Sequence, residues 1–302
     1  MMIELEKLST EENNLNSKDI ELQDSLEIVR RINEEDKKVA FCVEKELGSI
    51  SRLIDAILSK YKKETRIIYI GAGTSGRLGI LDASECPPTY GVSFEKVQGI
   101  IAGGNEAIFK AKENSEDNPE LGKQDLLNIN LTENDVVIGL AASGRTPYVL
   151  GAIEYANSIG AITGSITCSK SSDLSKVSQY PIEVPVGAEI VTGSTRMKAG
   201  TAQKMILNMI STTIMIKLGK VFSGYMVDVK TSNQKLIERA KRIIMKTANC
   251  DYEKASDTLK KARSDVKTAI VMILLDIDKN MAAEKLNQCD ENVAKIIHEN
   301  LK

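Results

Sequence analysis

Between residues 66 and 186 this 302-residue sequence alternates short β-rich runs with helical stretches, and no other feature limits its possible folds so strongly. The β-rich runs lie at 67–70, 97–102, 135–140, 161–168 and 180–186. Helical stretches are expected between them, at about 75–84, 105–114, 146–158 and 171–178. Repeated strand–helix units predict a parallel five-stranded sheet with helices on both faces, which makes three layers. Pro181 and Pro185 interrupt the last run, so we place that strand at an edge of the sheet.

Helical patterns flank this region on both sides. Residues 22–62 carry apolar side chains at helical spacing and predict two helices. A long helix is expected over 196–218, with Gly219 at its C-terminal end. Its apolar residues cover most of its circumference, which is typical of a helix buried on several sides. Such a helix lies either at the centre of a domain or in a subunit interface.

After residue 224 the strand signals end and only helical patterns follow. Helices are expected at 230–247 and 252–262, with three short helices within 265–300. The chain therefore divides into three predicted parts. They are an N-terminal helical arm, an α/β domain and a small C-terminal helical module, at 1–52, 53–222 and 223–302.

The composition argues against several classes of function. A net charge of −2 does not suit a nucleic-acid-binding protein, which needs a basic face or stripe. The longest apolar run, 269–275, is too short to cross a membrane, which takes about 20 residues. The five cysteines are far apart and form no C-x-x-C pair, which favours free thiols in the cytoplasm over a zinc site or disulfides. His298 is the only histidine, so acid–base catalysis should fall to carboxylates, or less often to Lys, Tyr or Cys.

The first strand runs into a glycine-rich turn at 71–77, GAGTSGR, which formally matches G-x-G-x-x-G. A dinucleotide site also requires an acidic residue near the end of the second strand. Gly104 and Asn105 stand there, and Glu106 comes only after the turn, so the dinucleotide interpretation is weakened. A turn of this kind before a helix also binds phosphate groups through its N–H groups, and Thr74 and Ser75 add hydroxyl donors. A tight turn needed only for packing remains the alternative.

A second turn of this type, 142–147, ASGRTP, follows the third strand. Ligands of open α/β sheets bind beyond the carboxyl ends of the strands, where both turns are expected. Two turns with hydroxyl side chains at that edge indicate a small anionic ligand such as a sugar phosphate. Ser143 and Thr146 could also serve only as helix caps.

The third polar segment, 189–201, EIVTGSTRMKAGT, opens the long buried helix. Glu189 could accept hydrogen bonds from sugar hydroxyls, beside the turn at Ser194. The alternative is an N-terminal capping segment in which Arg196 and Lys198 are solvated.

Four longer stretches together resemble one family, the N-acetylmuramic acid 6-phosphate etherases. The most specific is 71–89, GAGTSGRLGILDASECPPT, and 189–204 is similarly long and unusual. IAGG at 101–104 with EDN at 116–118, and MVDV at 226–229, continue the match.

This resemblance runs from about residue 5 to the C-terminus. A weaker one, to sugar-isomerase-type phosphosugar-binding (SIS) domains, covers about 53–222 and implies their flavodoxin-like fold. The sequence departs from the family at 10–16, TEENNLN, which lacks the Arg-Asn-Pro that usually follows Thr-Glu. A contact between the N-terminal arm and the site is therefore not carried over from the family.

The resemblance implies a lyase that cleaves the C3 lactyl ether of N-acetylmuramic acid 6-phosphate, giving N-acetylglucosamine 6-phosphate and D-lactate. Glu85 resembles the acid that protonates the departing lactate, and Glu116 resembles the base that removes the C2 proton. The chemistry needs no redox cofactor and no metal, which agrees with the lack of a His/Cys ligand cluster in the sequence.

The resemblance also implies where the substrate binds. The residues concerned are those of the three turns, Gly73, Thr74, Ser75, Ser143, Gly144, Arg145, Thr146, Glu189 and Ser194. Arg77 and Arg145 would supply charge or form structural ion pairs. A homodimer is implied, because the site in such proteins often lies where two subunits meet, and no nucleic acid or membrane partner is expected.

Three other functions stay open at this point. A sensor would bind the sugar phosphate without changing it, and would not need both glutamates. A phosphosugar isomerase would share the C2 proton abstraction but not the ether cleavage. A dehydrogenase is the most distant of the three, because the acidic residue of the dinucleotide motif is missing.

Overall fold

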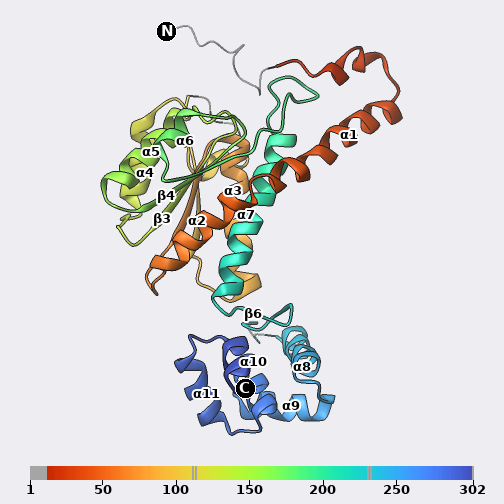
Figure 1. The fold of residues 1–302 in the computed structure, drawn as a ribbon, viewed down its shortest axis with the longest axis vertical. Helices are drawn as coiled ribbons and strands as arrows, with labels where there is room; N and C mark the ends of the chain where they lie inside the picture. Colours follow the sequence, from red (N-terminus) through yellow and green to blue (C-terminus); the bar gives the residue numbers. More distant parts are fainter. Residues whose placement is uncertain (1–11, 111, 113, 230, 232, 301–302) are drawn as a thin grey trace. The chain divides into compact units, whose positions relative to one another are not determined.

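The computed structural model describes residues 12–110, 112, 114–229, 231 and 233–300 (Figure 1). These residues belong to two compact units. The first is formed by Met1–Ser84 and Phe94–Ile210, and the second by Glu85–Ser93 and Ser211–Lys302. Within the described ranges, no helix is both long enough and apolar enough to span a membrane.

The first unit is built on a parallel sheet of five strands in the order β2-β1-β3-β4-β5. The strands are β1 (Ile67–Gly71), β2 (Val97–Ile101), β3 (Val136–Leu140), β4 (Ile162–Thr167) and β5 (Tyr180–Glu183). Because every pair is parallel, their carboxyl ends meet at one edge of the sheet. The predicted sheet is confirmed, and the proline-containing strand β5 lies at an edge as expected.

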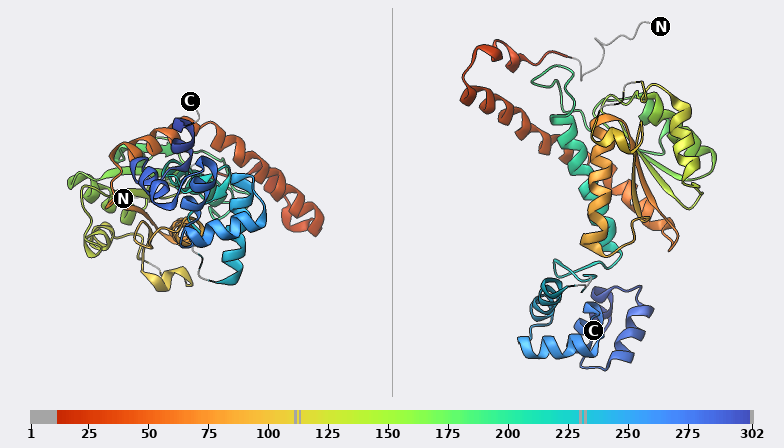
Figure 2. Two further views of the ribbon diagram at one scale, coloured as in Figure 1. Left: turned by 90° about the horizontal axis from the view of Figure 1, so that it is seen from below. Right: turned by 180° about the vertical axis from the view of Figure 1, so that it is seen from behind.

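Helices cover both faces of this sheet, as Figures 1 and 2 show. One face is covered by α4 (Pro119–Asn128), α5 (Pro147–Ser158) and α6 (Asp173–Val177). Its core joins side chains of the strands, such as Ile68 and Val137, to the buried side of α5. On the other face, α2 (Leu47–Lys60) packs on β4 and β5, and α3 (Gly73–Tyr90) packs on β1 through Gly79. The helix α7 (Lys198–Lys217) begins beside α3, where Gly200 approaches Leu78.

The prediction of a helix at 105–114 is wrong. The chain forms only a 3-10 turn there, η4 (Asn105–Ile108), and the true helix of this connection, α4, begins at Pro119. Asn118 supplies the N-cap, since its side chain accepts a hydrogen bond from the N–H of Glu120. The helix α3 is also longer than expected and continues through Pro87 to Tyr90.

The N-terminal helices are confirmed as α1 (Ser25–Glu44) and α2, preceded by two 3-10 turns, η2 (Leu15–Ser17) and η3 (Ile20–Leu22). Asp24 caps α1 by accepting a hydrogen bond from the N–H of Glu27. The N-terminal part of α1 reaches out from the body of the first unit (Figure 2).

The second unit holds the predicted C-terminal helices. They are α8 (Gln234–Ala248), α9 (Tyr252–Lys261), α10 (Val266–Leu275), α11 (Lys279–Gln288) and α12 (Val293–Asn300). The expected absence of strands after residue 224 is wrong, because β6 (Val221–Phe222) and β7 (Tyr225–Met226) form a small antiparallel hairpin. Just after it, Asp228 lies 2.8 Å from the buried Lys267 and 2.9 Å from Lys220, and these ion pairs fix the hairpin to α10.

Candidate active site

The glycine-rich turn after β1 is packed against its surroundings. A side chain at Gly71 would stand 2.8 Å from the backbone nitrogen of Gly76, and one at Gly76 would stand 2.7 Å from the carbonyl oxygen of Gly71. Ser75 is buried, and its hydroxyl lies 2.9 Å from Oε1 of Gln203 on α7, to which it donates. Close packing therefore accounts for Gly71, for Gly76 and for the serine hydroxyl of this turn. Gly73, in contrast, is exposed.

Gly73 and Glu116 line the same cavity, which we call the Glu116 cavity. Its volume is 210 Å³, and its lining residues are Ala72, Gly73, Arg77, Ala102, Ala107, Lys112, Ser115 and Glu116. The guanidinium of Arg77 donates to the carbonyl oxygens of Ala107 and Ile108, at 2.8 and 2.9 Å. Arg77 thus holds the η4 turn in place, and its charge has a structural role. The side chain of Glu116 is exposed.

The position of Glu116 is set by the helix pair α4 and α5. The carbonyl of Glu116 accepts a hydrogen bond of 3.0 Å from the N–H of Tyr148, in the first turn of α5. The Tyr148 hydroxyl donates to Asp125 on α4 at 2.6 Å. Burial, with Asp125 beside it, raises the pKa of Tyr148, so this hydroxyl keeps its proton. A side chain at Gly151 would stand 2.2 Å from the carbonyl oxygen of Pro119, so the two helices touch backbone to backbone just after Glu116.

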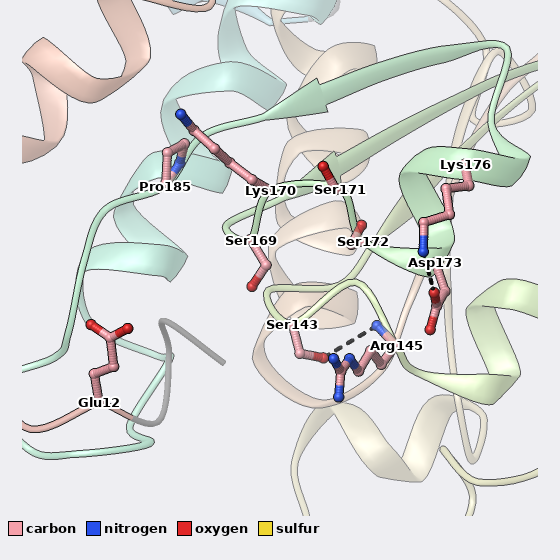
Figure 3. Close-up of a pocket in the computed structure, with 10 residues that line it drawn as sticks. All are labelled: Glu12, Ser143, Arg145, Ser169, Lys170, Ser171, Ser172, Asp173, Lys176 and Pro185. Carbon is pink, nitrogen blue, oxygen red and sulfur yellow. Dashed lines mark hydrogen bonds and ion pairs between the residues drawn. The ribbon is translucent and has the colours of Figure 1, made fainter. Parts of the chain in front are cut away.

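A second and larger cavity lies at the ends of β3 and β4, and we call it the Ser143 cavity (Figure 3). Its volume is 310 Å³, and its lining residues are Glu12, Ser143, Arg145, Ser169, Lys170, Ser171, Ser172, Asp173, Lys176 and Pro185. Gly144 has a φ of +67°, and a side chain there would stand 2.3 Å from the side chain of Ser172. This glycine therefore lets the turn after β3 pack against the loop after β4.

The carboxylate of Glu189 caps the N-terminus of α7 with both of its oxygens. It is buried and accepts hydrogen bonds from the N–H groups of Lys198 and Ala199, both at 3.0 Å, in the first turn of α7. The nearby Ser194 forms part of a tight turn, in which its N–H donates to the carbonyl of Val191. The capping alternative thus describes Glu189 well. That alternative is wrong in one respect, since it has Lys198 solvated, whereas this lysine is buried and forms a 2.6 Å ion pair with Glu35.

Glu35 receives three hydrogen bonds although it is buried. Burial alone would raise its pKa, but hydrogen bonds from Lys198, Lys38 and Asn16 outweigh burial and lower the pKa of Glu35 to about 2. Glu35 lies on α1 and Lys198 begins α7, so the pair joins the N-terminal helix to the start of the helix that carries Gln203.

The N-terminal arm contacts the segment around Glu189. The Asn14 side chain donates to the carbonyl of Ala188 at 2.8 Å, and the Ser17 hydroxyl donates to the carbonyl of Ile190 at 2.7 Å. Glu12 lines the Ser143 cavity. The described part of the segment that departs from the family thus borders the candidate site. Thr10 and Glu11 lie outside the described residues.

The structure brings only some of the predicted residues together. Gly73 and Glu116 share one cavity, and Ser143 and Arg145 share the other. Glu85 is exposed on α3, within the second unit, and lines neither cavity. The remaining predicted residues also line neither cavity; these are Thr74, Ser75, Gly144, Thr146, Glu189 and Ser194.

Several residues of the site were not found from the sequence. Gln203 and Tyr148 act through contacts with Ser75 and Glu116 that no local motif reveals. Ser169 and Lys170 follow β4. Their position at the carboxyl end of a parallel strand could have indicated that they border a ligand site. The described ranges hold no group of three or more His, Cys, Asp or Glu side chains that could bind a metal ion.

Comparison with known proteins identifies the family. Residues 49–157 match the glucokinase regulatory protein N-terminal SIS domain, and residues 115–213 match the SIS domain. N-acetylmuramic acid 6-phosphate etherase of Clostridium beijerinckii (strain ATCC 51743 / NCIMB 8052) is 55% identical to this chain, over 98% of both chains. The chain belongs to the N-acetylmuramic acid 6-phosphate etherase family. The etherase of Clostridioides difficile (strain 630) is 53% identical over 97% of this chain and 96% of its own length.

A solved structure supports the fold alone. A Bacteroides fragilis NCTC 9343 protein, a candidate phosphosugar isomerase involved in capsule formation, covers 68% of this chain with 98% of its own. It is 18% identical and superposes with a TM-score of 0.50. The resemblance read from the sequence is thus confirmed at the level of the family, and the fold is shared with this solved structure.

Proposed function

We propose that this member of the etherase family cleaves the C3 lactyl ether of N-acetylmuramic acid 6-phosphate. The observation that carries the proposal is its identity of 53–55% with etherases over nearly the whole chain. The structure adds that Glu116 stands at the rim of a cavity at the carboxyl edge of the sheet, where such folds bind ligands.

The proposed reaction is an elimination followed by a hydration. In the open-chain sugar the C1 aldehyde makes the C2 proton acidic, so a base can remove it. The electron pair of the C2–H bond forms a C2–C3 double bond, and the C3–O bond breaks to release lactate. Water then adds at C3 of the unsaturated aldehyde, and C2 regains a proton. The products are N-acetylglucosamine 6-phosphate and D-lactate.

Two glutamates supply the acid and the base in this proposal. Glu116 removes the C2 proton, and its exposed carboxylate lines the cavity in which the sugar would lie. Glu85 protonates the oxygen of the departing lactate. The hydrogen bond from Tyr148 and the tight contact of α4 with α5 hold Glu116 at the cavity rim.

The three polar segments hold the substrate in this proposal. The turn of Ser143, Gly144, Arg145 and Thr146 binds the phosphate end, and of these Ser143 and Arg145 line the Ser143 cavity. Gly73, in the lining of the Glu116 cavity, lies beside the reacting carbons. Thr74 and Ser75 shape the first turn. Glu189 acts indirectly, because its cap on α7 fixes the segment that carries Ser194.

We further propose that the enzyme is a cytoplasmic homodimer. The five cysteines form no disulfide bonds, as expected in a reducing compartment. The N-terminal arm exposes apolar side chains at Leu15, Leu22, Leu26 and Val29, with exposed fractions of 56–94%. Such a patch suits contact with a second copy. Changing Leu26 and Val29 together to Glu should convert dimer to monomer in size-exclusion chromatography with light scattering, while Leu127→Glu should not.

The direct test of the function is to incubate the purified protein with N-acetylmuramic acid 6-phosphate and assay D-lactate. Rapid and stoichiometric D-lactate is the expected result. If the sugar phosphate binds saturably but no lactate is released, the protein is a sensor of sugar phosphates and the proposed reaction is wrong.

A further inference from the structure

The helix α3, which carries Glu85, belongs to both compact units. It begins at Gly73 in the first unit, whereas Glu85 and the rest of the helix belong to the second unit. Pro87 and Pro88 lie within the helix, and neither has a backbone N–H. The turn that carries Glu85 therefore lacks two of the hydrogen bonds that an α-helix normally makes. Contacts outside the helix must contribute more to the position of this turn than they do in an ordinary helix.

The end of α3 packs against the backbone of Asp228, just after the hairpin of β6 and β7. Gly91 follows the helix with a φ of +68°, and a side chain there would collide with the carbonyl oxygen of Asp228. The missing side chain lets the end of α3 approach this backbone closely. Tyr90 adds a second contact, since its hydroxyl donates to the hydroxyl of Thr212 at 3.2 Å. All four residues belong to the second unit, as Glu85 does.

A buried lysine fixes the position of Asp228. Lys267, on α10, is 2% exposed, and its ammonium lies 2.8 Å from Oδ2 of Asp228. Among the described residues, no other group pairs or hydrogen-bonds with this ammonium. Lys220 adds a second ion pair to the same oxygen at 2.9 Å. A buried ion pair adds little net stability compared with apolar residues, so what it contributes here is a fixed geometry.

The contacts that fix Glu85 are separate from those that fix Glu116. Glu116 is held by Tyr148 and by the contact of α4 with α5, and all of these belong to the first unit. Asp228 and Lys267 belong to the second unit. A change at Asp228 or Lys267 should therefore affect the proposed acid and not the proposed base.

We infer that Lys267 and Asp228 are positioning residues for Glu85. The ion pair fixes the backbone of Asp228, this backbone holds Gly91, and Gly91 sets the turn of α3 that carries Glu85. The C-terminal helical module thus takes part in protonating the departing lactate. This inference rests on the proposed function for the role of Glu85 as the acid, but not for the contact that positions it.

The test uses Lys267→Met and Gly91→Ala in the full-length protein. Lys267→Met leaves Asp228 paired with Lys220, and Gly91→Ala keeps both ion pairs but pushes on the Asp228 carbonyl. In each variant, kcat for lactate release should fall about tenfold to hundredfold, as expected when a catalytic group is displaced by about 1 Å. KM and the exchange of the C2 proton with solvent deuterium should stay within about twofold of the wild type, because Glu116 belongs to the other unit.

Leu286→Ala is the matched control for stability. Leu286 is buried on α11 in the core of the same helical module and takes no part in the ion pairs of Asp228. Leu286→Ala should lower the melting temperature at least as much as Lys267→Met, because it leaves a cavity, but should keep the wild-type rate of lactate release below that temperature. A wild-type kcat in both test variants would overturn the inference. Equal losses of lactate release and C2 exchange, or a selective loss of lactate release in Leu286→Ala, would overturn it as well.

Hydrogen–deuterium exchange of the backbone separates this inference from the proposed function. Lys267→Met should raise the rate of deuterium uptake in residues 84–93 but not in residues 116–120. If the wild type releases lactate and uptake in 84–93 is unchanged, the positioning role is wrong and the function stands. If the wild type releases no lactate but uptake in 84–93 rises, the function is wrong and the positioning contact stands.

Discussion

The turns after β1 and β3 have the same kind of sequence but different surroundings. Each joins a parallel strand to a helix and combines glycine with hydroxyl side chains. The turn after β1 is covered by α7, whose Gln203 accepts the hydrogen bond of Ser75. The turn after β3 opens into a cavity lined by Arg145 and Lys170, which form no ion pair with the residues that the structure describes. The element that packs over such a turn thus decides whether its hydroxyls serve the fold or a ligand.

The largest expected effect concerns the acid and the base. Glu116→Gln should lower the rate of lactate release by about 10² to 10⁴ and should also slow exchange of the C2 proton with solvent deuterium, because the base is lost. Glu85→Gln should block lactate release while C2 exchange continues. Lactate assays and deuterium exchange by NMR measure the two steps separately.

The control for both glutamate variants is their melting temperature. It should stay near the wild-type value, because the side chains of Glu85 and Glu116 are exposed. Normal lactate release in both variants would show that the assigned roles are wrong.

The next largest effect concerns the ion pair that holds the start of α7, the helix that packs over the turn after β1. Lys198→Met leaves Glu35 buried without its main partner and should lower the free energy of unfolding by about 3 kcal/mol at pH 7. The pKa of Glu35 is lowered from 4.5 to about 2, so its stabilising effect is fully present above pH 4.5 and is lost as the pH falls towards 2.

The stability difference between Lys198→Met and the wild type should therefore narrow as the pH falls from 4.5 towards 2, as urea denaturation can measure. Lys176→Met, which breaks an exposed pair, should change stability by less than about 1 kcal/mol. A difference that stays constant with pH would contradict the role of Glu35.

The smallest expected effects are those of replacing Ser75, in the turn after β1, and Ser143, in the turn after β3. Ser75→Ala should lower the free energy of unfolding by about 1 kcal/mol, because buried Gln203 loses its donor, and should change KM only slightly. Ser143→Ala should leave stability nearly unchanged and should raise KM for the sugar phosphate. Thermal denaturation and steady-state kinetics of the two variants measure this, and a larger loss of stability in Ser143→Ala would reverse the comparison.

Much of the fold could be predicted because periodicity and turn residues are local signals. The parallel sheet, its edge strand and most helices were found in this way. The helix α4 was missed, although Asn118 and Pro119 are typical of a helix start, because Glu106 to Phe109 gave a competing helical pattern. The predicted division at 52/53 and 222/223 stays a prediction, which limited proteolysis can test.

The site was predictable only in part. Strand ends pointed to the turns of Gly73 and Ser143, and the family resemblance selected Glu116 from 42 acidic residues. The roles of Gln203 and Lys198 depend on partners 128 and 163 positions away, and spacing along the chain cannot reveal such contacts. The burial of Ser169 is likewise a property of the folded loop.

Isotope labelling in H₂¹⁸O is the most direct test of the proposed elimination and hydration. Because water adds at C3 after lactate has left, the label should appear in the C3 hydroxyl of N-acetylglucosamine 6-phosphate, and D-lactate should carry none. Label in the hydroxyl of lactate would mean that water attacks the lactyl carbon instead, and would contradict the roles of Glu116 and Glu85.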